Sequence, residues 1–441
     1  MARGNKKEEL SLEEKLEQAL VPVEEQPYEV PGNWCWVRLD GLVSIVTGKK
    51  DANYGSKNGE YTFFTCASEP IRCGGYSFEG ESLLLPGNGA NVGQVFYYDG
   101  KFEAYQRTYV LQSLADNINL KYLYYQIQGF WEEYNKDKQY GSATNYIKLD
   151  NFLNYSVPVA PLAEQQRIVE RIESLFAKLD EAKDKVQEVN DAIDESVEAV
   201  LYKAFTGQLT KEWRNLVTEI EKWNDTTLSD IVSGLKYGSS EKSDYEYQGI
   251  PVLRIPNIGD GIVDFSDIKY MSGELENSSH EVFENDILII RSNGSRDLVG
   301  KCAIVPKLKE RYAYASFLIR MKASEKVLPE YLVRYINSSL ARVQMFAKAK
   351  SSSGIHNINS KELGAIKICV PPIEEQRQIL TIIREIVDKE KKAREIAEEV
   401  IGNIDRLKKT ILSKAFRGEL GTNNLDEESA IDLLKEILME S

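Results

Sequence analysis

The chain has 441 residues, of which 42% are hydrophobic and 28% charged, which suits two or three domains with proper cores and excludes a largely disordered protein. No run of 18 apolar residues occurs and the first 15 residues are strongly charged, so we expect no membrane span, no secretion signal and a cytoplasmic location. The net charge of −14 hides its distribution: residues 30–150 carry −2 and residues 222–365 carry +1, so two large blocks can still face phosphates.

The N-terminal tail, residues 1–29, is expected to contain one short helix. Ser11 and Glu14 have the spacing of a capping box, and Leu12 and Leu16 lie on one face of the helix that follows. Docking of this face onto a partner and packing on the chain's own core are both open.

The block at residues 30–160 is expected to be a mixed α+β domain. Apolar runs at 82–86 and 155–161 are typical of strands, and 122–134 has the pattern of a helix. The loops of this block are rich in Asn, Ser, Gly, Tyr and Lys, which can donate to phosphates or read base edges. Ordinary polar turns have the same composition, so the alternative stays open.

A long helix is expected at residues 161–209. Its apolar residues from Ile168 to Ile193 step alternately by four and three, a 3.5-residue period that predicts a left-handed coiled coil. The helix begins just after Pro161 and ends at Gly207, which are the residue types that favour helix starts and helix ends. A pair of ordinary bundle helices is the alternative.

The second block, residues 210–370 with its leading linker, has the same mixed character. A strand is expected at 286–290 and a helix at 330–349. Two stretches, 291–311 and 334–361, are locally basic and can face phosphates.

A second long helix, residues 371–420, repeats the apolar period, which only Glu390 interrupts. The tail at 421–441 is expected to hold one more short helix, capped by Ser429. The residues predicted to form the coiled-coil core are Ile168, Ile172, Leu175, Leu179, Val186, Val189 and Ile193 in the first helix, and Ile379, Ile383, Ile386, Val400, Ile404, Leu407 and Ile411 in the second, with Ala182, Ala393 and Ala397 permitting close approach.

The two halves of the chain are copies of one unit. VAPLAEQQRIVERI at 159–172 resembles VPPIEEQRQILTII at 370–383, and LYKAFTGQL at 201–209 resembles LSKAFRGEL at 412–420, each pair being 211 residues apart. We therefore expect a tandem duplication in which the two long helices pack antiparallel, as an intramolecular coiled coil with pseudo-two-fold symmetry.

No catalytic motif is present. The sequence lacks a G-x-x-x-x-G-K-[ST] phosphate loop, a G-x-G-x-x-G motif between a strand and a helix, H-E-x-x-H and G-x-S-x-G. The Asn/Asp-Pro-Pro-aromatic motif of amino-methyltransferases is also absent. Five scattered cysteines form no C-x-x-C pair, and His280 and His356 lie 76 residues apart, so we expect free thiols and no metal site.

The repeated Pro-Leu/Ile-x-Glu-Gln-x-x-Ile helix start, the heptads and the Lys-Ala-Phe-x-Gly-x-Leu helix end resemble the specificity subunit of type I restriction-modification systems, over roughly residues 30–420. The Arg-Ser-Asn-Gly stretch at 291–294 and the Ser-rich loop at 351–354 also look like that family's target-recognition domains. The resemblance implies that each block reads one half of a bipartite site in double-stranded DNA and that the coiled coil sets the half-site spacing.

The resemblance also implies partners. Two methyltransferase subunits would dock on the coiled coil, and restriction and motor subunits would complete an ATP-dependent endonuclease that is also a DNA adenine methyltransferase. S-adenosylmethionine, ATP and Mg²⁺ would be used by those subunits, so this chain itself is expected to bind no cofactor and to be no enzyme. The rival function is a duplicated coiled-coil adaptor for other proteins, and binding to duplex DNA would separate the two.

The candidate DNA contacts are polar and basic side chains of the two blocks. They are Lys49, Lys50, Lys57, Asn88, Asn91, Thr144 and Asn145 in the first block, and Arg254, Arg291, Asn293, Arg296, Lys350, Ser352 and His356 in the second.

Overall fold

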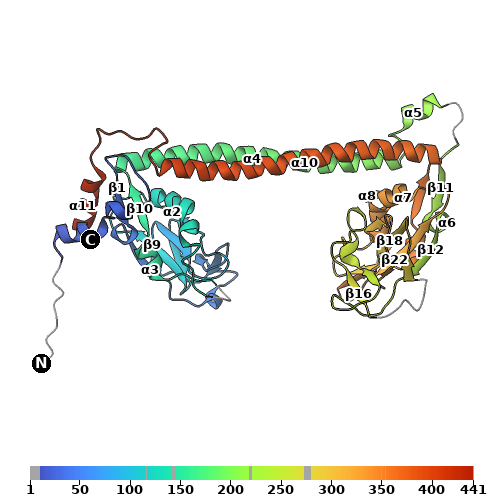
Figure 1. Cartoon of the computed structure of the whole chain (residues 1–441), viewed down its shortest axis with the longest axis horizontal. Helices are drawn as coiled ribbons and strands as arrows, with labels where there is room; N and C mark the ends of the chain where they lie inside the picture. The colour runs from blue at the N-terminus through green and yellow to red at the C-terminus, as the bar shows by residue number, and fades with distance from the viewer. Residues whose placement is uncertain are drawn as a thin grey trace. The chain divides into compact units, whose positions relative to one another are not determined.

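The computed structural model divides the chain into two compact units. Residues 1–186 and 399–441 form unit 1, and residues 187–398 form unit 2. The described residues are 10–115, 117–141, 145–217, 221–272, 280–348, 350–352 and 354–440. Each unit contains one mixed α/β domain and parts of both long helices, which confirms the predicted fold class (Figure 1).

The domain of unit 1 is built on two four-stranded sheets. The first has the order β2 (Val43–Thr47), β9 (Thr108–Ser113), β6 (Ser82–Pro86), β7 (Phe96–Tyr98), and the second has the order β4 (Ile71–Cys73), β3 (Tyr61–Phe64), β8 (Lys101–Ala104), β5 (Phe78–Glu79). An antiparallel ladder joins β1 (Cys35–Arg38) to β10 (Ser156–Val159). The helices of the domain are α2 (Leu120–Asn135) and α3 (Leu149–Leu153), and the 3₁₀ turns are η1 (Val23–Glu25), η2 (Leu39–Gly41) and η3 (Ala52–Tyr54).

The domain of unit 2 repeats this plan with two five-stranded sheets. Their orders are β12 (Val232–Tyr237), β22 (Leu318–Ala323), β18 (Asp286–Ile290), β20 (Cys302–Ile304), β15 (Gly261–Ile262), and β13 (Ser243–Asp244), β16 (Lys269–Met271), β14 (Pro251–Leu253), β21 (Tyr312–Tyr314), β17 (Glu281–Val282). A small sheet has the order β19 (Ser292–Asn293), β24 (Ile355–Asn357), β23 (Lys350–Ser352), and β11 (Asn224–Thr227) pairs with β25 (Lys367–Val370). The remaining elements are α5 (Lys211–Leu216), α6 (Leu228–Ile231), η4 (Ile255–Asn257), α7 (Pro329–Asn337), α8 (Ser339–Lys348) and α9 (Ser360–Gly364).

The helix predicted at 330–349 is two helices. The chain leaves α7 at Ser338, whose φ of −72° and ψ of 157° are those of extended backbone. The Ser338 hydroxyl donates to the carbonyl of Tyr335 at 2.6 Å, which satisfies a helix-end acceptor. Ser-Ser after an amphipathic run is a helix-end signal that the hydrophobic pattern alone does not reveal.

The two long helices are α4 (Leu162–Phe205) and α10 (Ile373–Ala415). Both end in the same motif, because Gly207 and Gly418 each adopt a φ of 74° that favours glycine. Within each unit the two helices run antiparallel: Lys408 pairs with Asp180 at 2.5 Å in unit 1, and Arg394 pairs with Asp194 in unit 2.

The predicted coiled-coil seam is wrong at two positions. Val189 is 54% exposed and Leu407 is 50% exposed, whereas Asn190 and Lys408 take the inward positions next to them. The reason is that a straight α-helix has 3.6 residues per turn and drifts by about 20° per heptad away from a 3.5-residue repeat. The inward Lys408 keeps its charge satisfied through Asp180.

The end of each long helix packs on the domain that the other half contributes. Phe416 of unit 1 lies 5.0 Å from the ring of Tyr122 in α2, and Phe205 of unit 2 lies 5.3 Å from the ring of Tyr331 in α7. The repeated Lys-Ala-Phe sequence therefore supplies an aromatic anchor to the core of each unit.

The tails pack on the chain's own core. The capping box of Ser11 and Glu14 starts α1 (Leu12–Ala19), and Lys15 of α1 donates to the carbonyl of Leu438 in α11 (Ala430–Glu440) at 3.1 Å. The apolar face of α11, including Leu434, is buried in the core of unit 1, so this face is not available to a partner. Among the described residues, no helix combines the length and the apolar character needed to cross a membrane.

Candidate nucleic-acid interface

The first candidate surface is a junction at the end of β18, in unit 2. The N–H of Arg291 donates to the carbonyl of Phe317, and the carbonyl of Arg291 accepts from the N–H of Ile358, both at 2.9 Å. The next residue, Ser292, pairs with Asn357 in the β19–β24 ladder. Three loops that lie far apart in the sequence therefore meet at this strand end.

The same junction recurs at the end of β6, in unit 1. The N–H of Gly87 donates to the carbonyl of Arg107 at 2.8 Å, and the carbonyl of Gly87 accepts from Ile147 at 2.9 Å. Asn88 then bridges to Tyr146, as Ser292 does to Asn357. The duplication has thus preserved this backbone arrangement while the side chains on it differ.

Arg291 is held flat by an aromatic ring. Its guanidinium carbon lies 4.3 Å from the ring centroid of Tyr237, and its Nε is buried without a hydrogen-bond partner. The Tyr237 hydroxyl accepts from the N–H of Ser360 at 3.2 Å, and this bonding to Ser360 lowers the pKa of Tyr237, although partial burial opposes the effect. The contact with the ring restrains the guanidinium, whose terminal nitrogens can bind a planar acceptor pair.

A second stacked arginine lies on the loop after β19. Arg296 lies 4.6 Å and Arg342 lies 4.7 Å from the ring centroid of Phe346. The guanidinium of Arg342 donates to the carbonyls of Val299 and Asp297, and these bonds anchor the loop. Arg296 is exposed and has no acidic partner among the described residues, so it is the member of the pair that can bind a ligand.

The other candidates of the second block differ in their freedom. Arg254 forms an ion pair with Asp267 at 2.9 Å, which gives its guanidinium a structural partner. The Asn293 side chain accepts from the N–H of Ser295 at 2.7 Å, and His356 is half-buried opposite Asn293. The remaining two candidates of this block are Lys350 and Ser352, whose backbones lie in β23.

The lysine and asparagine candidates of the first block have different surroundings. Lys50 lies 4.6 Å above the ring of Tyr54, and Lys49 and Lys57 are exposed. At the junction, Asn88 is half-buried. The Asn91 amide donates to the carbonyl of Cys66 at 2.8 Å, and the carbonyl of Asn145 accepts from Gly89 at 2.8 Å. Thr144 lies outside the described residues.

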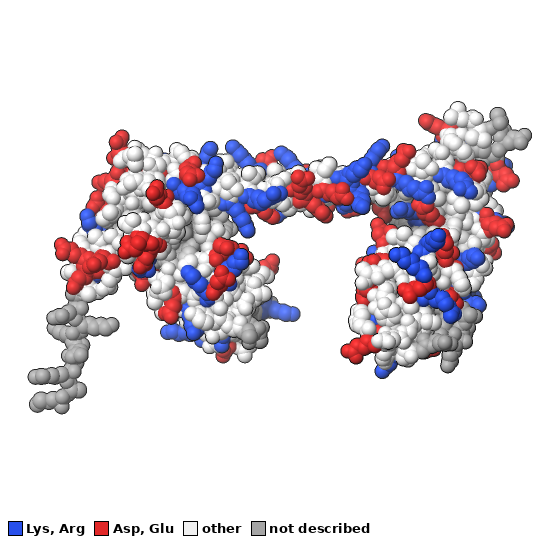
Figure 2. Space-filling model, viewed as in Figure 1, with Lys and Arg blue, Asp and Glu red and all other residues white. Residues whose placement is uncertain are grey.

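Charge alone does not mark a binding face. On the face that Figure 2 shows, Lys and Arg side chains are interspersed with Asp and Glu over each domain. The described residues contain no group of three or more His, Cys, Asp and Glu side chains that could hold a metal ion. What sets the junctions apart is therefore the rigid presentation of a few polar side chains rather than a strong field.

Comparison with known proteins decides the family. The model of the type I restriction modification DNA specificity domain matches residues 31–191 and again residues 220–400. The chain belongs to this family. It is 31% identical to the EcoKI specificity subunit of Escherichia coli strain K12 over 310 residues, which cover 68% of this chain and 67% of that protein.

Two further comparisons extend over almost the whole chain. The EcoDI specificity subunit of Escherichia coli is 26% identical over 440 residues, covering 93% of this chain and 96% of that protein. A solved structure described as part of the complex assembly and conformational transition of the type I R-M system aligns with a TM-score of 0.67 at 18% identity, covering 89% of this chain and all of that chain. This structural likeness shows the shared fold.

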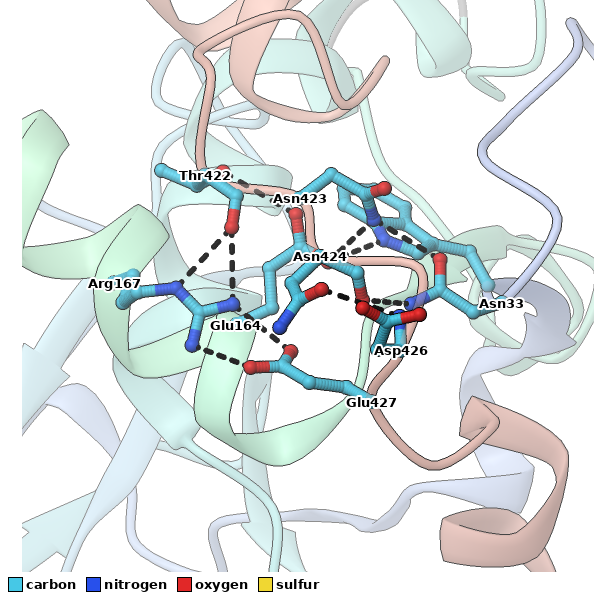
Figure 3. A network of polar contacts seen from close by, with 9 residues as sticks. Asn33, Glu164, Arg167, Thr422, Asn423, Asn424, Asp426 and Glu427 are labelled. Atoms are coloured by element: carbon cyan, nitrogen blue, oxygen red, sulfur yellow. Dashed lines mark hydrogen bonds and ion pairs between the residues drawn. The ribbon is translucent and has the colours of Figure 1, made fainter.

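The Glu-Gln pair that opens each long helix of this specificity subunit is a buried polar anchor. In unit 1, Glu164 is fully buried and accepts from Trp34 Nε1 and Asn423 Nδ2, both at 2.8 Å (Figure 3). In unit 2, Glu375 accepts from Trp223 Nε1 at 2.9 Å and Thr210 Oγ at 2.6 Å. Each carboxylate thus ties the segment that follows one long helix to the start of the other.

Figure 3 also shows how the neighbouring residues complete this anchor. Arg167, one turn along α4, donates to both carboxylate oxygens of Glu427 and to the carbonyl of Thr422. The repeated Glu-Gln sequence is therefore explained by its structural role in each unit.

Sequence reasoning missed several side chains at the junctions. Tyr140 and Tyr146 stack with a centroid distance of 5.6 Å, and Lys148 lies 4.2 Å from the Tyr140 ring. In unit 2 it missed Tyr237 and Asn357. A cluster of Tyr and Lys within nine residues was visible at 140–148, but the contact of Tyr237 with Arg291 crosses the sheet and has no local signal.

Proposed function

We propose that each domain reads one half of a bipartite DNA site. The observation that carries this proposal is the repeated strand-end junction, which presents Arg291 in unit 2 and Asn88 with the Tyr140–Tyr146 stack in unit 1. Arginine pairs with the two acceptors of guanine in the major groove, asparagine pairs with adenine, and aromatic faces support both. Because the two junctions carry different side chains, the two half-sites differ in sequence.

The long helices would set the spacing between the half-sites. α4 has 44 residues and α10 has 43, so each is roughly 65 Å long at 1.5 Å per residue. Inserting four residues at matched positions into both helices should lengthen the gap that the protein tolerates between half-sites. An unchanged gap in a variant that still binds would contradict the role of the helices as a spacer.

The long helices would also receive the methyltransferase subunits. Val189 is 54% exposed, Leu407 50% and Ile396 61%, so apolar side chains remain on the outer faces of both helices. Exposed apolar side chains on a helix surface favour packing against a partner's helices. The partners would bring S-adenosylmethionine and, with restriction subunits, ATP and Mg²⁺, while this chain supplies recognition and no catalytic residue.

The test is methylation sequencing of a host that carries this chain together with its methyltransferase partner. We expect a bipartite, adenine-methylated motif that disappears when only this chain is deleted. Arg291→Ala should relax one base pair in one half of the motif. Identical methylation patterns with and without the chain, despite good expression, would overturn the proposal and favour a protein-binding adaptor.

A further inference from the structure

The two junctions can be compared position by position. A backbone turn lies beside each junction. The N–H of Thr108 donates to the carbonyl of Tyr105 at 2.8 Å, and the N–H of Leu318 donates to the carbonyl of Ala315 at 2.9 Å. The third residue of the first turn is Arg107, and the third residue of the second is Phe317. Both offer their carbonyl to the strand-end residue, so Arg107 and Phe317 are equivalent.

The equivalence shows that the two domains carry an arginine at different positions of the junction. Unit 2 carries Arg291 on the strand end and Phe317 on the turn, whereas unit 1 carries Gly87 on the strand end and Arg107 on the turn. A side chain at position 87 is excluded, because a Cβ there would lie 2.5 Å from the Arg107 carbonyl oxygen. In unit 1 the turn is therefore the position from which a guanidinium can be presented at the junction.

Arg107 is well placed to present one. Its carbonyl accepts from Gly87 N–H at 2.8 Å and from the Cys66 thiol at 3.4 Å, so its backbone is fixed from two sides. Its side chain is exposed, and the structure shows no acidic partner for it among the described residues. The fixed backbone places Arg107 at the junction, and its unpaired guanidinium can pair with the two acceptors of a guanine.

We infer that Arg107 is a base-reading residue of the first domain and contacts a guanine in the major groove of the first half-site. The inference rests on the proposed function and adds to it the specificity residue that the sequence did not reveal. It also places guanine in both half-sites, read from the turn in one domain and from the strand end in the other.

The experiment selects bound duplexes from a randomised library with the full chain in complex with its methyltransferase subunits. The variants are Arg107→Ala and Arg107→Lys, and Arg171→Ala is the control because it removes the same charge from an exposed position on α4 of the same unit. We expect Arg107→Ala to lose discrimination at one guanine of the first half-site by about tenfold or more, with the second half-site unchanged. Arg107→Lys should retain overall affinity and lose part of that discrimination, because lysine cannot make the bidentate contact.

Other outcomes separate the inference from the proposal beneath it. A uniform loss of affinity for all sequences with a weaker salt dependence would make Arg107 a phosphate contact and overturn the inference. An unchanged motif in both Arg107 variants would also overturn it and leave the proposed function standing. If the complex of the unaltered chain selects no motif, the proposed function itself fails. A thermal melt of each variant, expected to match that of the Arg171→Ala control, tests whether Arg107 supports the fold instead.

Discussion

Replacing Glu164 by alanine tests whether the buried carboxylate anchors the C-terminal segment of unit 1. Glu164 is fully buried and accepts from Trp34 Nε1 and Asn423 Nδ2 at 2.8 Å, with a longer bond from Thr422 Oγ at 3.3 Å. Alanine leaves the buried Trp34 Nε1 without an acceptor, whereas the half-buried Asn423 Nδ2 keeps its bond to Asn33 Oδ1 at 3.0 Å. One unsatisfied buried donor costs about 1–3 kcal/mol, so the free energy of unfolding should fall by about that amount.

Glu170→Ala is the matched control for this variant. Glu170 lies on the same helix but is exposed, and it accepts only from Gln166, at 2.9 Å. Its loss should change the free energy of unfolding by less than about 0.5 kcal/mol. Glu164→Gln should lie between the two, because its carbonyl oxygen can still accept one of the bonds but carries no charge.

The assay combines urea unfolding with hydrogen exchange of the peptide at 418–428. If Glu164 acts as a local anchor, the alanine variant exchanges faster in that peptide even below the unfolding transition, whereas the Glu170 control does not. Equal unfolding midpoints for the alanine variants of Glu164 and Glu170 would refute the reasoning. So would faster exchange spread evenly over both units, because the contacts of Glu164 lie within unit 1 alone.

Three further predictions concern the helices and the second junction. Val189→Asp should leave the free energy of unfolding within about 0.5 kcal/mol of its original value, because Val189 is exposed. Ile193→Asp should lower it by about 1 kcal/mol or more, because Ile193 faces inward. Urea unfolding of the two variants checks this. Burial raises the pKa of Glu390, so the folded state binds a proton more tightly than the unfolded state. The free energy of unfolding therefore falls as the pH rises through that raised pKa. Glu390→Gln should raise the urea midpoint at pH 7 and leave it unchanged near pH 4. Tyr237→Phe keeps the ring beneath Arg291 and should preserve the DNA motif, whereas Tyr237→Ala should relax the base pair that Arg291 reads, as methylation sequencing would show.

The architecture could be predicted from the sequence because it is periodic and duplicated. The runs at 82–86 and 286–290 became β6 and β18, and the repeat at 211 residues located both long helices. The capping box at Ser11 was also visible, because it depends on two residues three positions apart. Such features are local, so neighbouring residues contain all the information that specifies them.

The candidate site was less predictable because its geometry is not local. The composition of the polar loops pointed to Arg291 and Asn88. The junctions, however, join residues that are 20 to 67 positions apart through single backbone hydrogen bonds. Arg107 carries no signal in the sequence, since it is one arginine in a short turn between two strands. The prediction that Val189 and Leu407 lie in the coiled-coil core was wrong for the opposite reason. It relied on a local 3.5-residue repeat, which a straight helix with 3.6 residues per turn does not follow over several heptads.

One ion pair shows how the duplication separates scaffold from recognition. Lys121 of α2 pairs with Glu173 of α4 at 2.8 Å in unit 1, and at the equivalent place in unit 2 Glu330 of α7 pairs with Arg384 of α10. The charges have exchanged sides while the contact between domain and helix start is retained. An exposed pair of this kind contributes only about 0–1 kcal/mol, so its stability alone does not explain its retention. The contact of the domain with its helix is thus present in both halves with the charges reversed, whereas the arginines at the junctions stand at different positions, Arg291 on the strand end and Arg107 on the turn. The two halves therefore share the placement of the domain on its helix and differ in the side chains at the junction, which is what the proposed reading of two different half-sites requires.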